Sequence, residues 1–373
     1  MSRLREKVNW QFSDSLECER ESGPSSGTIF HDSQTEVPTC TSNWDKHHLN
    51  QLQITTVLSK AYTPMDIINS FKIYRLSYDY EVLIDQRVKK ISDHLFSCMP
   101  SGLQALNFDD FSSVPSKTAT SLLYDKYDGS WNDKSFSVPP LPGPSDAKDE
   151  YWRESFRVNG DLFSKRLMYM TWLREQDLPV SEHLFQELFQ HFSAMFGLDA
   201  IGAPGVKCET LRIGDVEVTS TPDLVYYDFP KCSHDQGSKI FVVCEVEKEA
   251  LQNNEEPSPP KTSRYEEGGQ QQIHHISSNL IGQHGGDLLT HFHFKSSIQY
   301  GLFGFIVQCT SITFTHLDCS EIDFEQIRTG NPSFPPGTGP VIRFSQPYNF
   351  LKAEDRRHII PPLLKLGLIK SYM

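Results

Sequence analysis

Three carboxylates stand at the ends of two short apolar runs. Asp223 comes directly before the run 224–227. Glu245 and Glu247 lie two and four residues after the end of the run 240–243. Carboxylates that converge repel one another unless a cation lies between them, and hard oxygen ligands suit Mg²⁺ or Mn²⁺. Such a metal can activate a water for phosphodiester cleavage. The residue types therefore indicate a metal-dependent hydrolytic site.

Two strands joined by a loop must position these acids. Both apolar runs are rich in β-branched and aromatic residues and are bounded by turn formers, which predicts buried strands. Side chains alternate across a strand, so Glu245 and Glu247 share a face, and Asp223 joins them if the strands pair. In the simpler alternative, Asp223 is a turn residue after a proline, and Glu245, Glu247 and Lys248 form the solvated end of a strand.

The two motifs together resemble the core of the PD-(D/E)XK nuclease superfamily. A Pro-Asp, here Pro222-Asp223, opens one strand, and an acid-x-Lys, here beginning at Glu245, closes the next. The resemblance implies a restriction-endonuclease-like α/β fold over 151–373, with a mixed central sheet flanked by helices. It also implies that Asp223 and Glu245 hold the metal during phosphodiester hydrolysis.

The lysine of the motif is displaced in this chain. Glu247 stands where the family has its water-polarising lysine, and Lys248 follows one residue later. In a regular strand Lys248 points to the opposite face, although a β-bulge could re-aim it. The resemblance implies that Glu247 is a third ligand or orients the water, a place at which the family tolerates an acid.

Two helices flank the predicted strands. The first runs from Ser181 to Phe196, and Glu182 in its first turn either completes the metal site, as the resemblance implies, or favours the helix dipole. The second is predicted to begin at 270. The resemblance implies that Gln271 or Gln272 there reaches the scissile phosphate or orients the base, whereas ordinary surface glutamines are the alternative.

Five histidines follow the acids: His274, His275, His284, His291 and His293. If 291–293 is a strand, two of the imidazoles share a face, and zinc has to be considered. No third ligand of suitable spacing accompanies them. A phosphate-contacting or merely exposed role is therefore favoured over a zinc site.

Composition narrows the class of protein. The chain has 373 residues and a net charge of −13, with a pI of about 5.5, and this balance counts against a constitutive nucleic-acid binder. No apolar run approaches the roughly 20 residues that span a bilayer, so we expect no membrane partner. The eight cysteines form no C-x-x-C motif, and the first residues are polar. Both features indicate a reducing, intracellular location, either nuclear or cytoplasmic.

The chain divides into three predicted regions. Residues 1–55 are polar and aperiodic, which predicts a disordered tail. Residues 56–150 contain two helices within 62–95, followed by irregular sequence and a proline-rich linker at 138–144. The nuclease-like region occupies 151–373 and includes a disordered insert at 252–269.

Further elements are predicted inside the last region. Gly214-Asp215 joins two short apolar segments into a hairpin over 211–218, and a second hairpin covers 300–317. Near the end, Pro361-Pro362 is expected to separate two short helices.

These observations favour a divalent-metal-dependent nuclease with a nucleic-acid substrate, DNA in preference to RNA. The resemblance also implies a homodimer, because many relatives cut two strands as dimers. The alternative is a catalytically inactive nuclease-fold domain that recognises a protein or a nucleic acid. An unrelated α/β enzyme has no support from a P-loop, G-x-S-x-G or G-x-G-x-x-G motif.

Overall fold

The computed structural model describes residues 37–59, 61–70, 78–121, 135–143, 147–228, 239–249, 276–296 and 300–372. All of them belong to one compact unit that begins at Val37. The insert predicted over 252–269 lies outside the described residues, and so do Gln271, Gln272, His274 and His275.

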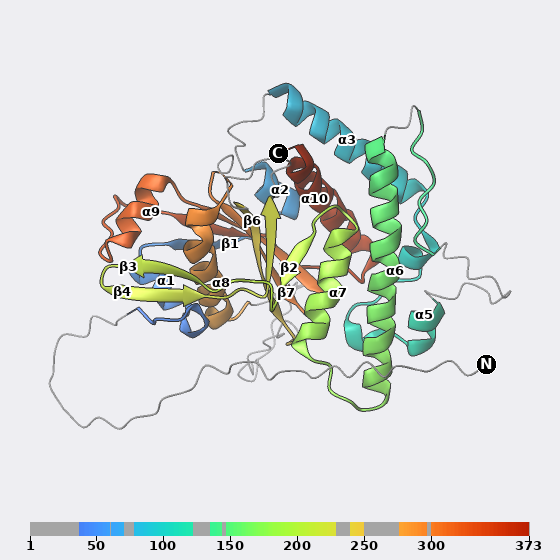
Figure 1. Cartoon of the computed structure of the whole chain (residues 1–373), viewed down its shortest axis with the longest axis horizontal. Coiled ribbons are helices and arrows are strands. Elements are labelled where there is room, and N and C mark those ends of the chain that lie inside the picture. Colours follow the sequence, from blue (N-terminus) through green and yellow to red (C-terminus); the bar gives the residue numbers. More distant parts are fainter. Residues whose placement is uncertain are drawn as a thin grey trace, which may run out of the picture. The chain divides into compact units, whose positions relative to one another are not determined.

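An eight-stranded mixed sheet forms the centre of this unit (Figure 1). Its order is β1 (Thr55–Leu58), β9 (Val341–Phe344), β8 (Ser311–Asp318), β7 (Leu302–Gln308), β6 (Lys239–Glu247), β5 (Leu224–Asp228) and β2 (Ala200–Gly202), with β10 (Tyr348–Asn349) paired to β8. The pairs β6–β7 and β1–β9 are parallel, and the other neighbours are antiparallel. The predicted α/β class and the β7–β8 hairpin are thus confirmed.

β5 and β6 pair as the apolar runs predict. Leu224 stands opposite Cys244, and the register shifts between Tyr226 and Tyr227, where Phe241 has no partner. The bulge therefore lies near the start of β6. From Val242 to the end of the strand the side chains alternate regularly, which places Glu245 on the face opposite Cys244.

Helices cover both faces of the sheet, and each side has its own apolar core. One core contains side chains of α2 (Pro64–Asn69), α3 (Tyr78–Ser97), α4 (Ser101–Gln104), η2 (Phe111–Ser113), α6 (Ala147–Glu175), α7 (Glu182–Ala194) and α10 (Ala353–Tyr372). The other contains Trp44, which directly follows η1 (Thr41–Asn43), and side chains of α1 (Lys46–Gln51), α8 (Ser278–His291), η3 (Phe292–Phe294) and α9 (Glu321–Arg328). In addition, α5 (Ser116–Ser121) packs against α6. Figure 1 shows α8 and α9 on one side of the sheet, with α6 and α7 on the other.

The hairpin predicted over 211–218 forms β3 (Glu209–Ile213) and β4 (Val216–Ser220). It is a separate two-stranded sheet and does not join the central one. It packs on α8 and α9, and Ser220 at its end is buried. Helix α7 also follows the sequence prediction, because Gly197 comes after its last turn with a φ of 82°.

Two segments predicted to be tail or linker are part of the packed structure. Residues 37–55 contain η1 and α1 and place Trp44 and Leu49 in the core, so the disordered tail predicted over 1–55 is wrong for this stretch. In the proline-rich segment, Val138 and Leu141 are buried, and the Val138 carbonyl accepts a hydrogen bond of 2.8 Å from Arg153 Nε. Apolar side chains between prolines can anchor such a segment without any regular structure.

α10 corrects another local expectation. The prediction of two short helices separated at Pro361-Pro362 is wrong, because one helix continues through both prolines. Ile359, Ile360 and Leu363 beside them are buried in the core. Tertiary burial of this face outweighs the local preference against proline in a helix interior.

Candidate functional site

Asp223 and Glu245 meet where β5 begins. Because Leu224 pairs with Cys244, the residue before β5 lies beside the end of β6. The Val246 backbone N–H donates a hydrogen bond of 2.8 Å to Asp223 Oδ2. The expectation that the strands pair and bring Asp223 to Glu245 is therefore confirmed by the register.

Helix α8 brings a third carboxylate to these two. Asp287 is 1 % exposed and Glu245 is 3 % exposed. Asp287 and Asp223 both lie close enough to Glu245 to raise its pKa. We call Asp223, Glu245 and Asp287 the acid cluster. Oε1 of Glu245 and Oδ2 of Asp287 are buried and have no hydrogen-bond partner.

Polar side chains hold the other oxygens of the cluster. Gln283, one turn before Asp287 on α8, donates from Nε2 to Glu245 Oε2 over 2.8 Å. Thr41 Oγ1 and Ser220 Oγ each donate to Asp287 Oδ1 over 2.6 Å. One oxygen of Glu245 and one of Asp287 are thus fixed by neutral donors, while the second oxygen of each is left without one.

Burial and mutual repulsion favour protons in the acid cluster. Burial raises the pKa of Glu245 well above its usual value, and the nearby Asp287 and Asp223 raise it further. Burial also raises the pKa of Asp223 to about 6, against the lowering effect of the Val246 N–H. Within the described ranges, neither lysine nor arginine forms an ion pair with these acids.

Two more acids lie at the partly exposed rim of the cluster. Glu182 is the first residue of α7, and its charge raises the pKa values of Asp223 and Glu247. Glu247 ends β6 and is half-buried; burial is the main cause of its raised pKa, followed by Glu182 and Glu249. Glu182 therefore acts electrostatically at the cluster, in addition to its favourable place in the first turn of a helix.

Lys248 does not enter the acid cluster. It is exposed and follows the last residue of β6. The bulge in β6 lies at Phe241, near the start of the strand and seven residues before Lys248, so it does not re-aim the Lys248 side chain. The charge of Lys248 lowers the pKa of Glu247, and its carbonyl accepts a hydrogen bond from Cys309 Sγ.

The glutamine at the cluster is not one that the sequence indicated. The predicted Gln271 and Gln272 fall outside the described residues, and α8 begins at Ser278, not at 270. Gln283 occupies the position next to Glu245. The usable signal was the spacing of Gln283, Asp287 and His291, which at every fourth residue lie on one face of a helix.

Among the described residues, His284, His291 and His293 are not arranged as a zinc site. Residues 291–293 are the end of α8 and the start of η3, so the strand considered there is wrong. His284 is buried against Thr315, with 2.7 Å between Nε2 and Oγ1. In the described part of the chain, no group of three or more His, Cys, Asp or Glu side chains is placed so that it could hold a metal ion by itself.

Ser220, Asp287 and His291 also meet, but not as a nucleophilic triad. Ser220 donates to Asp287, and His291 Nδ1 lies 2.8 Å from the Asp287 carbonyl oxygen. Ser220 is buried, so its hydroxyl is not open to a substrate. The roles differ from those of a triad, in which the acid orients the histidine and the histidine activates the serine. Here the serine positions the acid.

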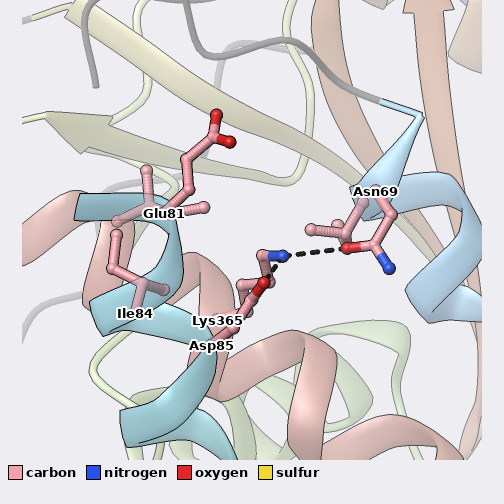
Figure 2. Close-up of a pocket in the computed structure, with 7 residues that line it drawn as sticks. Asn69, Glu81, Ile84, Asp85 and Lys365 are labelled. Atoms are coloured by element: carbon pink, nitrogen blue, oxygen red, sulfur yellow. Dashed lines mark hydrogen bonds and ion pairs between the residues drawn. The ribbon is translucent and has the colours of Figure 1, made fainter. Parts of the chain in front are cut away.

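Figure 2 shows a separate pocket between α2, α3 and α10. Its volume is about 210 Å³. Lys365 Nζ lies 2.7 Å from Asp85 Oδ1 and 2.8 Å from Asn69 Oδ1, so its charged group is already engaged. None of the acids of the cluster or its rim lines this pocket. The acid cluster is therefore the stronger candidate for chemistry.

The Thr41 hydroxyl gives a direct test of how Asp287 is held. We expect Thr41→Val to lower the free energy of unfolding by about 1–2 kcal/mol, because a buried carboxylate loses one donor and keeps only Ser220. Thr338→Val is the matched control, because its hydroxyl binds a carbonyl at an exposed turn. Denaturant unfolding measures both; equal changes in the two variants would contradict this role for Thr41.

No protein-family model, curated protein or solved structure matches this chain. Among the described residues, none of the helices combines the length and apolar character needed to cross a membrane. The functional argument therefore depends on the geometry and electrostatics of the acid cluster.

Proposed function

We propose that this protein is a divalent-metal-dependent nuclease of the PD-(D/E)XK, restriction-endonuclease-like type, and that it hydrolyses phosphodiester bonds at the acid cluster. The observation that carries the proposal is the pair of buried carboxylate oxygens, Glu245 Oε1 and Asp287 Oδ2, that lack a hydrogen-bond partner. The carboxylates of Glu245 and Asp287 lie close together, and neither forms an ion pair with a lysine or arginine among the described residues. A cation would relieve both the repulsion and the missing hydrogen bonds.

The donor chemistry fits Mg²⁺ or Mn²⁺. Both ions prefer hard oxygen ligands, and Mg²⁺ is commonly bound by one or two carboxylates together with waters and substrate phosphates. A group of three protein ligands is therefore not required. Glu245 and Asp287 would hold the ion with their unpartnered oxygens, and Asp223 would be the third acid beside it. When bound, the metal would lower the pKa of a water and stabilise charge on the phosphate.

The surrounding residues support this assignment of roles. Gln283 fixes Glu245, and Thr41 and Ser220 fix Asp287, so each acid presents one defined oxygen. The Val246 N–H fixes Asp223. Glu247 and Glu182 lie at the partly exposed rim, where Glu247 can orient a water and where a phosphate would enter.

The arrangement of elements agrees with the proposed fold. A helix, α7, precedes the sheet; the Pro-Asp strand pairs with the acid strand; and α8 follows that strand and contributes a glutamine and an acid. We propose DNA as the preferred substrate. The acidic balance of the chain means that the bound cation, not a basic surface, would have to offset the charge of the phosphates.

One observation favours a second function. No lysine reaches the acid cluster among the described residues, because Lys248 is exposed beyond β6 and Glu247 takes the place of the motif's lysine. A domain that had lost catalysis would keep Glu245 protonated, because burial and the neighbouring acids raise its pKa well above its usual value. It would then recognise a protein or a nucleic acid without cleaving it.

Metal binding separates the two functions. We expect calorimetry to show Mn²⁺ or Mg²⁺ binding to the parent, and loss of that binding in a Glu245→Gln, Asp287→Asn double variant that keeps the shapes of both side chains. Glu217→Gln is the matched control, because Glu217 is an exposed carboxylate on β4. The titration is repeated with a non-hydrolysable phosphodiester present, since phosphate oxygens can complete the site.

Cleavage is assayed on single- and double-stranded DNA and on RNA with Mn²⁺ or Mg²⁺. We expect Asp223→Ala to reduce the rate by at least about 100-fold, because even residues behind the metal ligands typically change activity by 10–100-fold. A parent that neither binds metal with phosphodiester present nor cleaves would overturn the nuclease proposal and favour the recognition domain. An Asp223→Ala variant as active as the parent would contradict the role of the cluster.

A further inference from the structure

Helix α6 carries an exposed apolar stripe that the acid cluster does not explain. Its members are Tyr151, Val158, Leu162, Tyr169 and Trp172. Tyr151 is 74 % exposed, Tyr169 44 % and Trp172 48 %, and the rings of Tyr169 and Trp172 stack with 6.0 Å between their centres. We call these five residues the α6 stripe. They recur three, four or seven residues apart, which places them on one face of the helix.

The opposite face of α6 is fully committed to the core. Phe156, Phe163, Leu167 and Met170 are completely buried there. The helix therefore does not need the stripe in order to pack within its own chain. Large aromatic side chains exposed in a row are unusual for a monomer surface and are typical of interfaces.

Four of the five residues of the stripe lie symmetrically along the helix about the level of Gly160, and Trp172 has no counterpart. Tyr151 and Tyr169 lie nine residues before and after this position, and Val158 and Leu162 lie two residues before and after it. If two copies of this helix run antiparallel and are related by a two-fold axis at this level, aromatic side chains meet aromatic ones and aliphatic side chains meet aliphatic ones. Tyr151 would face the partner's Tyr169, and Val158 would face the partner's Leu162.

Two charged residues beside the stripe follow nearly the same symmetry. Glu154 lies six residues before Gly160 and Lys165 five residues after it, both on the exposed face, and Glu154 also pairs with Arg157 of its own helix over 2.7 Å. In the antiparallel pair, Glu154 of each copy would lie beside the partner's Lys165. In a parallel pair, equal charges would stand opposite each other, which is unfavourable. The charge pattern therefore selects the antiparallel two-fold arrangement.

We propose that the α6 stripe is a homodimer interface in which two copies of this chain pack α6 against α6 in antiparallel orientation. The three aromatic side chains, at roughly 200 Å² each, expose about 330 Å². With Val158 and Leu162, the stripe supplies about half of the 800 Å² per partner found in stable complexes. The dimer is therefore weak and its population depends on protein concentration. This proposal does not depend on the nuclease activity.

The mass of the full chain in solution tests the interface. Sedimentation over a range of concentrations is expected to show a monomer–dimer equilibrium for the parent. Leu162→Glu places like charges close to the two-fold axis and is expected to weaken the dimer by at least about tenfold, as for a central interface residue. Ile322→Glu is the control, because Ile322 is an exposed apolar residue on α9, outside the stripe.

Charge exchange tests the orientation. Glu154→Lys and Lys165→Glu are each expected to weaken the dimer, and the double variant is expected to restore it, because the exchanged pair meets its opposite again across the two-fold axis. Thermal unfolding of each variant shows that the fold is intact. A parent that is monomeric at all concentrations overturns the interface. A dimer that Leu162→Glu leaves unchanged, or a double variant without recovery, overturns the proposed packing.

Discussion

Replacing Gly282 with alanine is expected to lower the free energy of unfolding by about 3–5 kcal/mol, the range of a severe steric conflict in a core. A Cβ at this position would lie 2.2 Å from both the carbonyl carbon and the Cα of Asp45. Because the obstacle is backbone, no side-chain rotation relieves it. The segment that contains η1 and α1 would have to move away from α8.

That movement would reach the acid cluster. The same segment carries Thr41, whose hydroxyl holds Asp287, and it places Trp44 and Leu49 in the core. Hydrogen exchange is expected to show lost protection for residues 41–52 in Gly282→Ala, and calorimetry is expected to show weaker binding of Mn²⁺ at the proposed metal site. Both changes follow from one methyl group, because the segment packs on the helix as a unit.

The steric conflict at Gly282 reverses the usual effect of a glycine-to-alanine change on the free energy of unfolding. A glycine-to-alanine change inside an unobstructed helix stabilises a protein by about 0.5–1 kcal/mol. Asn279→Ala, at an exposed position of the same helix, is the control and is expected to be neutral or slightly stabilising. A stabilised Gly282→Ala variant would show that the segment 41–52 does not pack on α8 as described.

Acid is expected to destabilise the protein through two buried histidines, His284 and His316. Burial lowers the pKa of each from 6.5 to about 4, although neighbouring carboxylates, Asp287 for His284 and Asp318 for His316, act in the opposite direction. Between pH 6.5 and 4 the unfolded chain binds protons that the folded protein excludes. Stability is therefore present above pH 6.5 and falls as the pH falls, by about 1.4 kcal/mol per pH unit for each histidine.

A His284→Gln variant isolates this contribution. Glutamine keeps a nitrogen donor toward Thr315 but does not titrate, so about 3 kcal/mol of pH-dependent loss is expected to disappear by pH 4. The acid cluster acts in the opposite direction, because the folded protein takes up protons there. For that reason the difference between variant and parent is measured, by denaturant unfolding at pH 4, 5, 6 and 7.

His358→Gln is the control for the histidine prediction, since His358 is exposed on α10. A His284→Gln variant with the same pH dependence as the parent would mean that His284 is already accessible to protons in the folded protein.

Local patterns were sufficient to predict the strands that carry the first two acids. The runs before and after residues 229–238 are apolar and rich in β-branched and aromatic residues, and they pair as expected, with Leu224 opposite Cys244. Period-two alternation then places Glu245 on the α8 face. The end of α7 at Gly197 was equally predictable, because a positive φ strongly favours glycine.

The rest of the site depends on contacts between distant parts of the chain. Asp287 lies 42 residues after Glu245, and Thr41 lies 246 residues before Asp287. No local rule joins these positions. Gln283 was missed for a second reason, because the helix was predicted to begin at 270, which favoured the glutamines near that start. At Pro361-Pro362, burial of the flanking isoleucines outweighed the local signal.

The parallel pairing of β1 with β9 sets the order in which the protein can assemble during synthesis. β1 ends at Leu58, whereas its partner strand begins at Val341. During synthesis β1 therefore cannot pair until the chain has reached β9. The segment with Thr41 has the same delay until α8 has been made. The hydrogen bond from Thr41 to Asp287, and with it the supported acid cluster, is thus completed only after α8 has been synthesised.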